Sequence, residues 1–322
     1  MSKAENNTKK FPAVALGTWS WGVGAVGGDQ VFGNHLGTDE LKPVFERAME
    51  EGLNLWDSAV VYGMGASEEI LGNFTKDYPR ENVIISTKFT PQIAGDGADP
   101  VAEMCDSSLQ RFHADYIDIY WIHNPADVET WTPFLAPLVK SGKVKQVGVS
   151  NHNLAQIKRA EEILAKDGIR LAAVQNHYSL LYRSSERAGI LDYCKEKGIA
   201  FFAYMVLEQG ALSGKYGTAH PLPAGSQRAE TYNPILPQLE VLTEEMRAMG
   251  AEHNESVSQI AMAWAVAKGA IPLIGVTKPS HVTEAAAAAK IQLSAAEMEK
   301  LEALAAAAGV DTRGSWENPM EQ

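Results

Sequence analysis

The chain alternates between two patterns of hydrophobic and polar positions. Short apolar runs rich in β-branched residues are each followed by a stretch in which apolar residues recur at helical spacing. This alternation predicts parallel strands joined by helices that cover the sheet. We expect eight strands, at Ala13–Leu16, Asn54–Trp56, Val83–Thr87, Tyr116–Trp121, Gln146–Val149, Ala172–Gln175, Ala200–Tyr204 and Ile271–Gly275. The clearest helices are expected at Leu41–Glu51, Ser67–Phe74, Val101–Phe112, Leu154–Lys166, Ala188–Lys197 and Val257–Lys268.

Eight such units favour an α/β fold whose strands close into a single (β/α)8 barrel, the TIM barrel. Two connections are too long for simple loops, 22–37 after the first strand and 207–254 after the seventh. Both would lie at the C-terminal mouth of the barrel, where active sites form, and the second should contain a helix at Leu236–Met249. An extra C-terminal helix is expected at Ser294–Ala308, opened by a capping box from Ser294 to Glu297. Several helices are expected to end at a glycine just before a strand, namely at Gly52, Gly142, Gly168, Gly198 and Gly269.

Length and composition narrow the class of protein. A chain of 322 residues could hold two domains, but the strand count favours one barrel domain over residues 1–322. The net charge of −12 and the pI near 5.2 disfavour a nucleic-acid or anionic-membrane partner and favour a small molecule. Cys105 and Cys194 are too few for a disulfide framework or a Cys-rich zinc site. The polar start over residues 1–10 has no signal-peptide core, and no apolar stretch is long enough for a bilayer, so we expect a cytoplasmic protein.

Two glycine-rich motifs resemble nucleotide-binding loops but lack their sequence context. Gly22–Gly27 matches GxGxxG, yet further Gly and Asn residues follow, so no helix is expected to open there and a mobile loop is the better interpretation. Gly210–Lys215 has the wrong spacing for a phosphate-binding P-loop. The histidines show no metal-ligand spacing, so no metal is expected, and His152 and His177 are interpreted as structural or surface residues.

Four polar residues stand near the C-terminal ends of the second, third and fourth strands. Asp57 follows the second strand, Tyr62 lies five positions further on, Lys88 ends the third strand and His123 follows the fourth. Taken singly, each has an ordinary explanation, such as a turn cap, a rim aromatic, a solvated charge or a local hydrogen bond. Because strand ends at a barrel mouth point into one cavity, the four can converge although they are far apart in sequence.

Together these four groups predict carbonyl chemistry. A free Tyr has a pKa of about 10, too high for acid–base catalysis near neutrality. A neighbouring ammonium would favour the phenolate and lower that pKa. Asp57 would hold Lys88 in place and protonated, while His123 would orient a substrate carbonyl. Tyr62 could then protonate the carbonyl oxygen as hydride reaches the carbon.

The sequence resembles the aldo-keto reductase superfamily over nearly the whole chain. The resemblance is carried by LGTWSWG, GLNLWDSAVVYGMGASEEILG, VIISTKF, SLQRFHADYIDIYWIHNP, GKVKQVGVSNHN, AAVQNHYSLLYR, FFAYMVLEQGALSGKY and IPLIGVTKPSHVTEA. It implies NAD(P)H bound in an extended form across the barrel mouth, without a Rossmann domain. It also implies a catalytic tetrad of Asp57, Tyr62, Lys88 and His123, in which Tyr62 is the general acid in reduction and the base in alcohol oxidation.

The resemblance further implies which residues contact the cofactor. Ser150, Asn151 and Gln175 match residues that hydrogen-bond the nicotinamide carboxamide, and Tyr204 matches the aromatic residue that stacks on the nicotinamide ring. The remaining contacts are expected at Thr18 and Trp19, at Leu207, Gln209, Gly210, Leu212 and Lys215 along the pyrophosphate, and at Gly275, Thr277, Lys278, His281 and Glu284 around the adenosine.

The chain departs from the family pattern where the 2′-phosphate of NADPH binds. The usual Arg is His281, and the common Asn after Glu284 is Ala285. A His is neutral much of the time at pH 7 and lacks the bidentate fork of Arg, although Thr277 and Lys278 could still hold a phosphate. NADPH is therefore the favoured cofactor, with NADH or dual use open. Near the nicotinamide, Met205 and Val206 replace small residues or Pro.

The substrate end is the least determined part of the site. Trp19, Trp21 and Asn124 are expected to face the substrate, although Trp21 could equally pack against the Gly-rich loop. Such a pocket suits an apolar or ring-bearing aldehyde or ketone, or the corresponding alcohol. Two alternatives stay open: a cofactor-binding regulatory subunit with little turnover, similar to the channel-associated β subunits of the superfamily, and a Schiff-base lyase that uses Lys88. The oligomeric state is not predicted.

Overall fold

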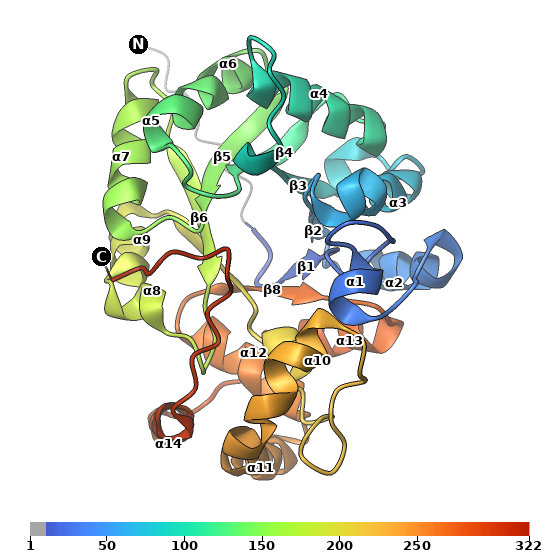
Figure 1. Ribbon diagram of the computed structural model, residues 1–322, viewed down its shortest axis with the longest axis vertical. Coiled ribbons are helices and arrows are strands. Elements are labelled where there is room, and N and C mark those ends of the chain that lie inside the picture. Colours follow the sequence, from blue (N-terminus) through green and yellow to red (C-terminus); the bar gives the residue numbers. More distant parts are fainter. Residues whose placement is uncertain (1–10, 322) are drawn as a thin grey trace.

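All eight predicted strands form, and they close into one barrel. The computed structural model describes residues 11–321, so the polar start from which no signal peptide is expected lies outside the described residues. Each strand pairs in parallel with its sequence neighbours, and the first pairs with the last (Figure 1). This confirms the (β/α)8 prediction. The strands are β1 (Ala15–Gly17), β2 (Leu55–Asp57), β3 (Ile84–Phe89), β4 (Ile117–Ile122), β5 (Val144–Ser150), β6 (Leu171–His177), β7 (Ala200–Tyr204) and β8 (Ile271–Gly275).

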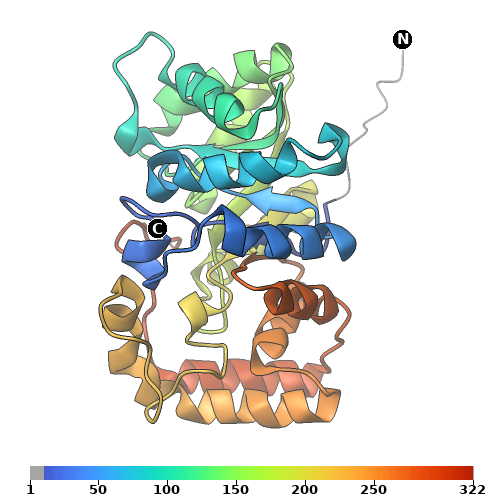
Figure 2. The same cartoon turned by 90° about the vertical axis from the view of Figure 1, so that its right-hand side faces the viewer.

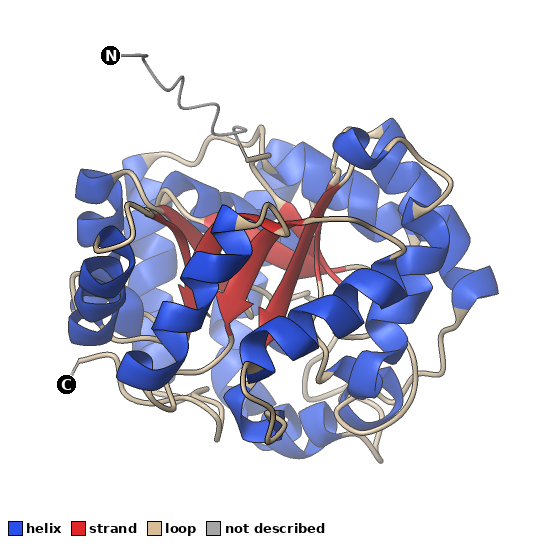
Figure 3. Cartoon of the chain, turned by 90° about the horizontal axis from the view of Figure 1, so that it is seen from above, coloured by secondary structure: helices blue, strands red, loops and turns tan. Residues whose placement is uncertain are grey.

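Helices surround the barrel, as the sequence pattern predicts (Figure 3). They pack their apolar faces on the outer side of the strands, so the strands are buried on both faces and read as nearly continuous apolar runs. The helix expected at Ala188–Lys197 begins two residues later, at Ile190, because its N-cap Gly189 takes a left-handed conformation. The covering helices are α2 (Thr38–Glu50), α3 (Ala66–Thr75), α4 (Pro100–Phe112), α5 (Val128–Trp131), α6 (Leu135–Lys140), α7 (Leu154–Ala165), α8 (Ser184–Arg187), α9 (Ile190–Lys197), α12 (Val257–Ala267) and α13 (Pro279–Ala288).

The interior of the barrel is filled by side chains. Buried residues from six of the eight strands form an apolar cluster that includes Trp121 and Phe202, whose rings meet edge to face at 5.5 Å. Space is tight enough there to require a glycine: a Cβ at Gly148 would come within 2.3 Å of the Trp121 ring. The barrel therefore has a packed floor, and any site has to lie at its open ends.

The first long connection and residues 207–228 of the second lie at the C-terminal mouth. The first contains the short helix α1 (Gly28–Phe32), which opens directly after the GxGxxG motif. The expectation that no helix follows that motif is therefore wrong. The dinucleotide fingerprint is still excluded, because α1 has five residues and belongs to a barrel loop rather than to a doubly wound sheet. The second connection contains α10 (Gln227–Tyr232) and α11 (Leu236–His253), which includes the predicted helix. Figure 2 shows α1 and α10 at the same end of the barrel.

The predicted helix ends are confirmed. The final helix, α14 (Ala295–Ala308), begins with a capping box in which Ser294 and Glu297 bond each other's backbone N–H. Beyond α14 the chain runs back over the mouth of the barrel (Figure 1). No helix within residues 11–321 is long and apolar enough to cross a membrane. The predicted helix-ending glycines all adopt left-handed φ angles, at Gly52, Gly142, Gly168, Gly198 and Gly269.

Candidate active site

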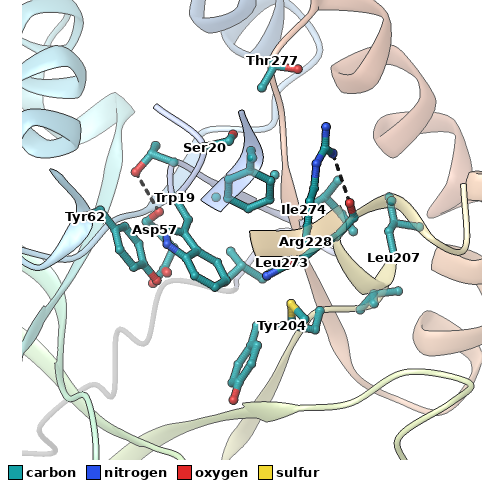
Figure 4. Close-up of a pocket in the computed structure, with 18 of the residues that line it drawn as sticks. Trp19, Ser20, Asp57, Tyr62, Tyr204, Leu207, Arg228, Leu273, Ile274 and Thr277 are labelled. Atoms are coloured by element: carbon teal, nitrogen blue, oxygen red, sulfur yellow. Dashed lines mark hydrogen bonds between the residues drawn. The ribbon is translucent and has the colours of Figure 1, made fainter. Parts of the chain in front are cut away.

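A cavity of about 1180 Å³ opens at the C-terminal ends of the strands. It is walled by strand ends, by both long connections and by the last residues of the chain, and Figure 4 shows Tyr62 and Trp19 on one side of it and Leu207 and Arg228 on the other. Most of the predicted site residues line this one cavity: Thr18, Trp19, Asp57, Tyr62, His123, Asn124, Ser150, Asn151, Gln175, Tyr204, Leu207, Gln209, Gly210, Lys215, Gly275, Thr277, Lys278, His281 and Glu284.

Asp57 and Lys88 form an ion pair at the floor of the cavity. Asp57 ends β2 and Lys88 lies in β3, so neighbouring parallel strands present both side chains at the mouth. The Lys88 ammonium donates to the Asp57 carboxylate and, at 2.6 Å, to the Ser58 carbonyl, and both charged side chains are buried. Burial lowers the pKa of Lys88, and the Asp57 carboxylate opposes this shift. Lys88 therefore lies beneath the cavity wall and acts on the site through its charge.

Further hydrogen bonds hold the Asp57 carboxylate in place. Its Oδ1 accepts from the Ser86 hydroxyl at 2.6 Å and from the Gln175 amide at 3.2 Å. The Ser86 oxygen in turn accepts from the Trp121 indole N–H at 2.7 Å. Gln175, predicted as a nicotinamide contact, thus also ties β6 to the Asp57–Lys88 pair.

Tyr62 lies above this ion pair. The Lys88 nitrogen is 5.3 Å from the centre of the Tyr62 ring, which stacks on Trp19 at 5.8 Å and meets the His123 ring edge to face at 6.1 Å. The pKa of Tyr62 is well above its usual value because burial and the Asp57 carboxylate both disfavour the phenolate. The prediction of a lowered pKa is therefore wrong. The protein holds Tyr62 as a neutral phenol, the form that donates a proton.

His123 lies beside Tyr62 as a neutral imidazole. Its Nδ1 lies 2.9 Å from the Thr90 hydroxyl. Burial and the nearby Lys88 charge hold the pKa of His123 well below its usual value. When Nδ1 accepts from Thr90, the ring proton is on Nε2 and can be donated to an oxygen in the cavity.

Asn151, one of the predicted carboxamide contacts, is held by several hydrogen bonds just beyond the end of β5. Asn151 has a left-handed φ of 62° and donates from its amide to the His123 carbonyl at 2.9 Å and to Asn124 at 3.1 Å. Its carbonyl oxygen accepts from the Tyr204 hydroxyl at 2.6 Å. A strained backbone held by such a network is typical of ligand sites. The network fixes the ring that is predicted to stack on nicotinamide.

The segment predicted to follow the pyrophosphate curves along the cavity, with one exception. Gln209 and Gly210 have left-handed φ angles of 51° and 106° and face the cavity, as does Lys215. Leu212 is fully buried in the hydrophobic core and does not line the cavity, so its prediction as a direct contact is wrong. The apolar side chain anchors the loop from below.

The predicted adenosine end of the cavity lies at the start of α13. His281 accepts a hydrogen bond at Nδ1 from the Thr277 backbone N–H at 3.3 Å. Burial and the charges of Lys278 and Lys215 lower the pKa of His281, so the imidazole is neutral near pH 7. Within residues 11–321 neither lysine forms an ion pair, so both charges are free for an anion at the cavity wall.

The two tryptophans of the LGTWSWG segment point in opposite directions. Trp19 lines the cavity. Trp21 is fully buried, packs on Trp56 and Phe74, and donates from its indole nitrogen to the Val276 carbonyl at 2.7 Å. The prediction that Trp21 faces the substrate is therefore wrong, because the tight turn that begins at Thr18 directs it into the core.

Among the cavity residues that were not predicted from the sequence are Phe32, Arg228 and Trp316, which lie in the two long connections and the C-terminal segment. Arg228 donates to the Gln209 carbonyl at 3.2 Å and lies near the rings of Phe32 and Tyr216. Phe32 and Trp316 are aromatic residues in otherwise small or polar segments, which is the one signal the sequence offered. No spacing rule would have placed any of the three at this site.

Comparison with known proteins agrees with this geometry. The model of the aldo/keto reductase family matches residues 13–306. The chloroplastic pyridoxal reductase of Arabidopsis thaliana is 30% identical over 306 residues, which cover 90% of this chain and 82% of the relative. An aldo-keto reductase of Strobilurus tenacellus is 30% identical over 90% of this chain and 88% of its own length.

Solved structures with the same fold extend the comparison. The glycerol dehydrogenase of Gluconobacter oxydans superposes with a TM-score of 0.77 at 25% identity, over 92% of both chains. An aldo-keto reductase of Klebsiella pneumoniae in complex with NADPH superposes with a TM-score of 0.70 at 25% identity, over 91% of both chains. The chain therefore belongs to the aldo/keto reductase family and is an NAD(P)H-dependent oxidoreductase.

Proposed function

We propose that the whole chain works as one catalytic unit that reduces an aldehyde or ketone with NADPH, or oxidises the corresponding alcohol. The observation that supports this most strongly is the position of Tyr62 above the buried Asp57–Lys88 pair, in the same cavity as the cationic adenosine end. The residues present fit a dinucleotide. Lys215 and Lys278 would hold its phosphates, the start of α13 would favour their negative charge, and Tyr204 would flank the nicotinamide. The cofactor, when bound, supplies the hydride.

The proton comes from Tyr62. The substrate carbonyl oxygen accepts hydrogen bonds from the Tyr62 hydroxyl and from Nε2 of His123, which polarise the carbonyl and orient it. As negative charge develops on the oxygen, Tyr62 transfers its proton. The Lys88 ammonium stabilises the resulting phenolate through space, and Asp57 keeps the ammonium in position. In the reverse direction the same phenolate accepts the proton of the alcohol.

The cofactor preference rests on His281. The neutral imidazole offers no charge to a 2′-phosphate, so discrimination depends on Lys278, Lys215 and the Thr277 hydroxyl. We propose NADPH as the preferred cofactor with measurable use of NADH, because part of the usual 2′-phosphate recognition is missing. Cys105 and Cys194 are free thiols, which agrees with a proposed cytoplasmic location.

The test is turnover of a carbonyl panel by the purified protein, followed by nicotinamide absorbance with NADPH and with NADH. The panel includes benzaldehyde-type, aliphatic and cyclic carbonyls, with pyridoxal added because a relative carries that name. Glycerol, which the name of a structural neighbour suggests, is tested separately as an alcohol, with NADP+ or NAD+ as the hydride acceptor. Turnover of any member supports the proposal. Tight NADPH binding without turnover would instead support a regulatory subunit, and borohydride trapping of a carbonyl substrate on Lys88 would support a lyase.

A further inference from the structure

The last residues of the chain form a strap across the mouth of the barrel. Residues 309–321 leave α14 and run back over the mouth (Figure 1), where Glu317 contacts His177 at the end of β6 and Trp316 contacts Tyr204 at the end of β7. Along this strap Thr312, Glu317 and Met320 are buried, whereas the residues between them are largely exposed. The strap therefore touches the barrel at a few anchor points and has no secondary structure of its own.

The central anchor is a buried ion pair. His177, the last residue of β6, lies between two carboxylates: its Nε2 is 3.0 Å from Oε1 of Glu208, and its Nδ1 is 3.0 Å from Oε1 of Glu317. All three side chains are inaccessible to solvent. Only the imidazolium form can donate from both nitrogens. His177, which the sequence suggested to be structural or on the surface, is therefore a buried cation that joins the barrel to the strap.

Glu208 extends this anchor to three other segments. It accepts from the hydroxyls of Ser179, Tyr232 and Thr312, so the loop after β6, α10 and the strap all meet on one carboxylate. The rings of Tyr182 and Tyr204 flank His177 at 4.3 and 5.5 Å. Within residues 11–321 no Lys or Arg forms an ion pair with Glu208 or Glu317. His177 thus supplies the positive charge of the anchor.

The anchor places Trp316 in the cavity wall. Trp316, next to Glu317, meets Trp19 edge to face at 5.9 Å and donates from its indole nitrogen to the Tyr204 hydroxyl at 3.4 Å. It reaches the cavity at the substrate end, beside the ring that stacks on Tyr62. Trp316 is 44% exposed, so packing alone does not hold it there.

We propose that the His177–Glu317 pair fastens residues 309–321 across the mouth and thereby makes Trp316 a wall of the substrate pocket. His177 and Glu317 are positioning residues, and Trp316 is a specificity-determining residue for ring-bearing carbonyl substrates. The proposal rests on the proposed function. Replacing Glu317 removes the charge-assisted hydrogen bond that joins the strap to His177, while Glu208 still pairs with the imidazolium. A strap with few other contacts then opens locally.

The test separates strap docking from catalysis. Arg313 is exposed within the strap, so trypsin should release residues 314–322 when the strap opens. We compare Glu317→Gln with Glu321→Gln, a matched control four residues further on whose carboxylate pairs with Arg187 at the surface. Glu317→Gln should raise the cleavage rate by about tenfold, as expected for loss of one charge-assisted hydrogen bond, whereas Glu321→Gln should stay near the wild-type rate.

Steady-state kinetics then test whether Trp316 forms a wall of the substrate pocket. With a benzaldehyde-type substrate, Glu317→Gln and Trp316→Ala should each raise KM by about tenfold, while kcat and the Kd for NADPH change by less than about twofold. The increase in KM should be smaller for a short aliphatic aldehyde, because such a substrate does not reach Trp316. Trp316→Ala should leave trypsin cleavage near the wild-type rate, because the anchor is intact.

Distinct outcomes bear on the two proposals. Equal rates of trypsin cleavage for the Glu317→Gln and Glu321→Gln proteins would overturn the proposal that the His177–Glu317 pair fastens the strap. An unchanged KM for the aromatic substrate in Trp316→Ala would overturn the proposal that Trp316 is a wall of the substrate pocket. Faster cleavage of Glu317→Gln than of Glu321→Gln would support the fastening of the strap by His177 and Glu317. If the wild-type protein at the same time turned over no member of the panel, the proposed function would be overturned and the fastening of the strap would stand.

Discussion

The ammonium of Lys88 and the carboxylate of Asp57 are hydrogen-bonded to each other at the floor of the cavity, where both side chains are buried. The two ends of this pair are not equally supported. Asp57 also accepts from Ser86 and Gln175, whereas Lys88 has the Ser58 carbonyl as its other partner. Replacing the carboxylate should therefore lower the free energy of unfolding more than replacing the ammonium.

We expect Asp57→Asn to lower the free energy of unfolding by about 3–5 kcal/mol, because it leaves the Lys88 charge buried without its partner. Lys88→Met should destabilise the protein less, since two donors still bond the carboxylate. Urea unfolding of both variants and of the double variant measures the difference. A larger loss in Lys88→Met would contradict the assignment of partners.

Replacing Tyr62 by Phe should lower kcat by about 10²–10⁴-fold, because the proton donor is gone while the ring that stacks on Trp19 remains. The Kd for NADPH, measured by fluorescence, should be nearly unchanged. Tyr193→Phe, a phenol on α9 that bonds Glu161 away from the cavity, serves as the control. Full activity of Tyr62→Phe would sink the mechanism.

His281→Arg should tighten NADPH binding by about ten- to hundredfold, the range expected for a new charge-assisted hydrogen bond to the 2′-phosphate. NADH lacks that phosphate, so its Kd should change little. For the wild-type protein, NADPH affinity should rise as pH falls through the lowered pKa of His281, because the imidazole then gains charge. Equal changes in the Kd values for NADPH and NADH would show that residue 281 does not recognise the 2′-phosphate.

The strap should open at alkaline pH. The two carboxylates raise the pKa of His177 from 6.5 to about 9, against the opposing effect of burial. The stabilisation that this shift provides is complete below the unfolded-state pKa, about 6.5, and is lost as pH rises through about 9. We expect the rate of trypsin cleavage after Arg313, normalised to a reference peptide, to rise across this range. Glu317→Gln should show a much flatter profile, and an equally steep one would argue against His177 as the titrating group.

Gly148→Ala should destabilise the barrel. A Cβ at this position would meet the Trp121 ring at 2.3 Å, and overpacking of this kind costs about 1–3 kcal/mol. Thermal unfolding measures the loss. Gly217→Ala is a suitable control, because nothing lies within 4 Å of a Cβ there. Equal stability of the two variants would mean that the barrel floor has more space than the structure implies.

The sequence by itself determined the barrel and most of the cavity. Each β-α unit carries its own pattern of apolar positions, and parallel strands close in chain order, so Asp57, Lys88 and His123 reach one mouth whatever the loops do. Cavity residues at strand ends and just beyond them, such as Ser150 and Tyr204, were predictable for the same reason.

Only the tertiary structure decided the features that depend on irregular segments and on burial. Trp19 and Trp21 come from one short motif, yet a turn sends one into the cavity and the other into the core. The raised pKa of Tyr62 follows from desolvation and from Asp57, neither of which has a local signature. His177 and Glu317 are 140 residues apart, and no periodic pattern announces where an irregular tail packs. Local patterns specify elements, whereas long-range contacts between loops are specified only by the space that the folded barrel leaves.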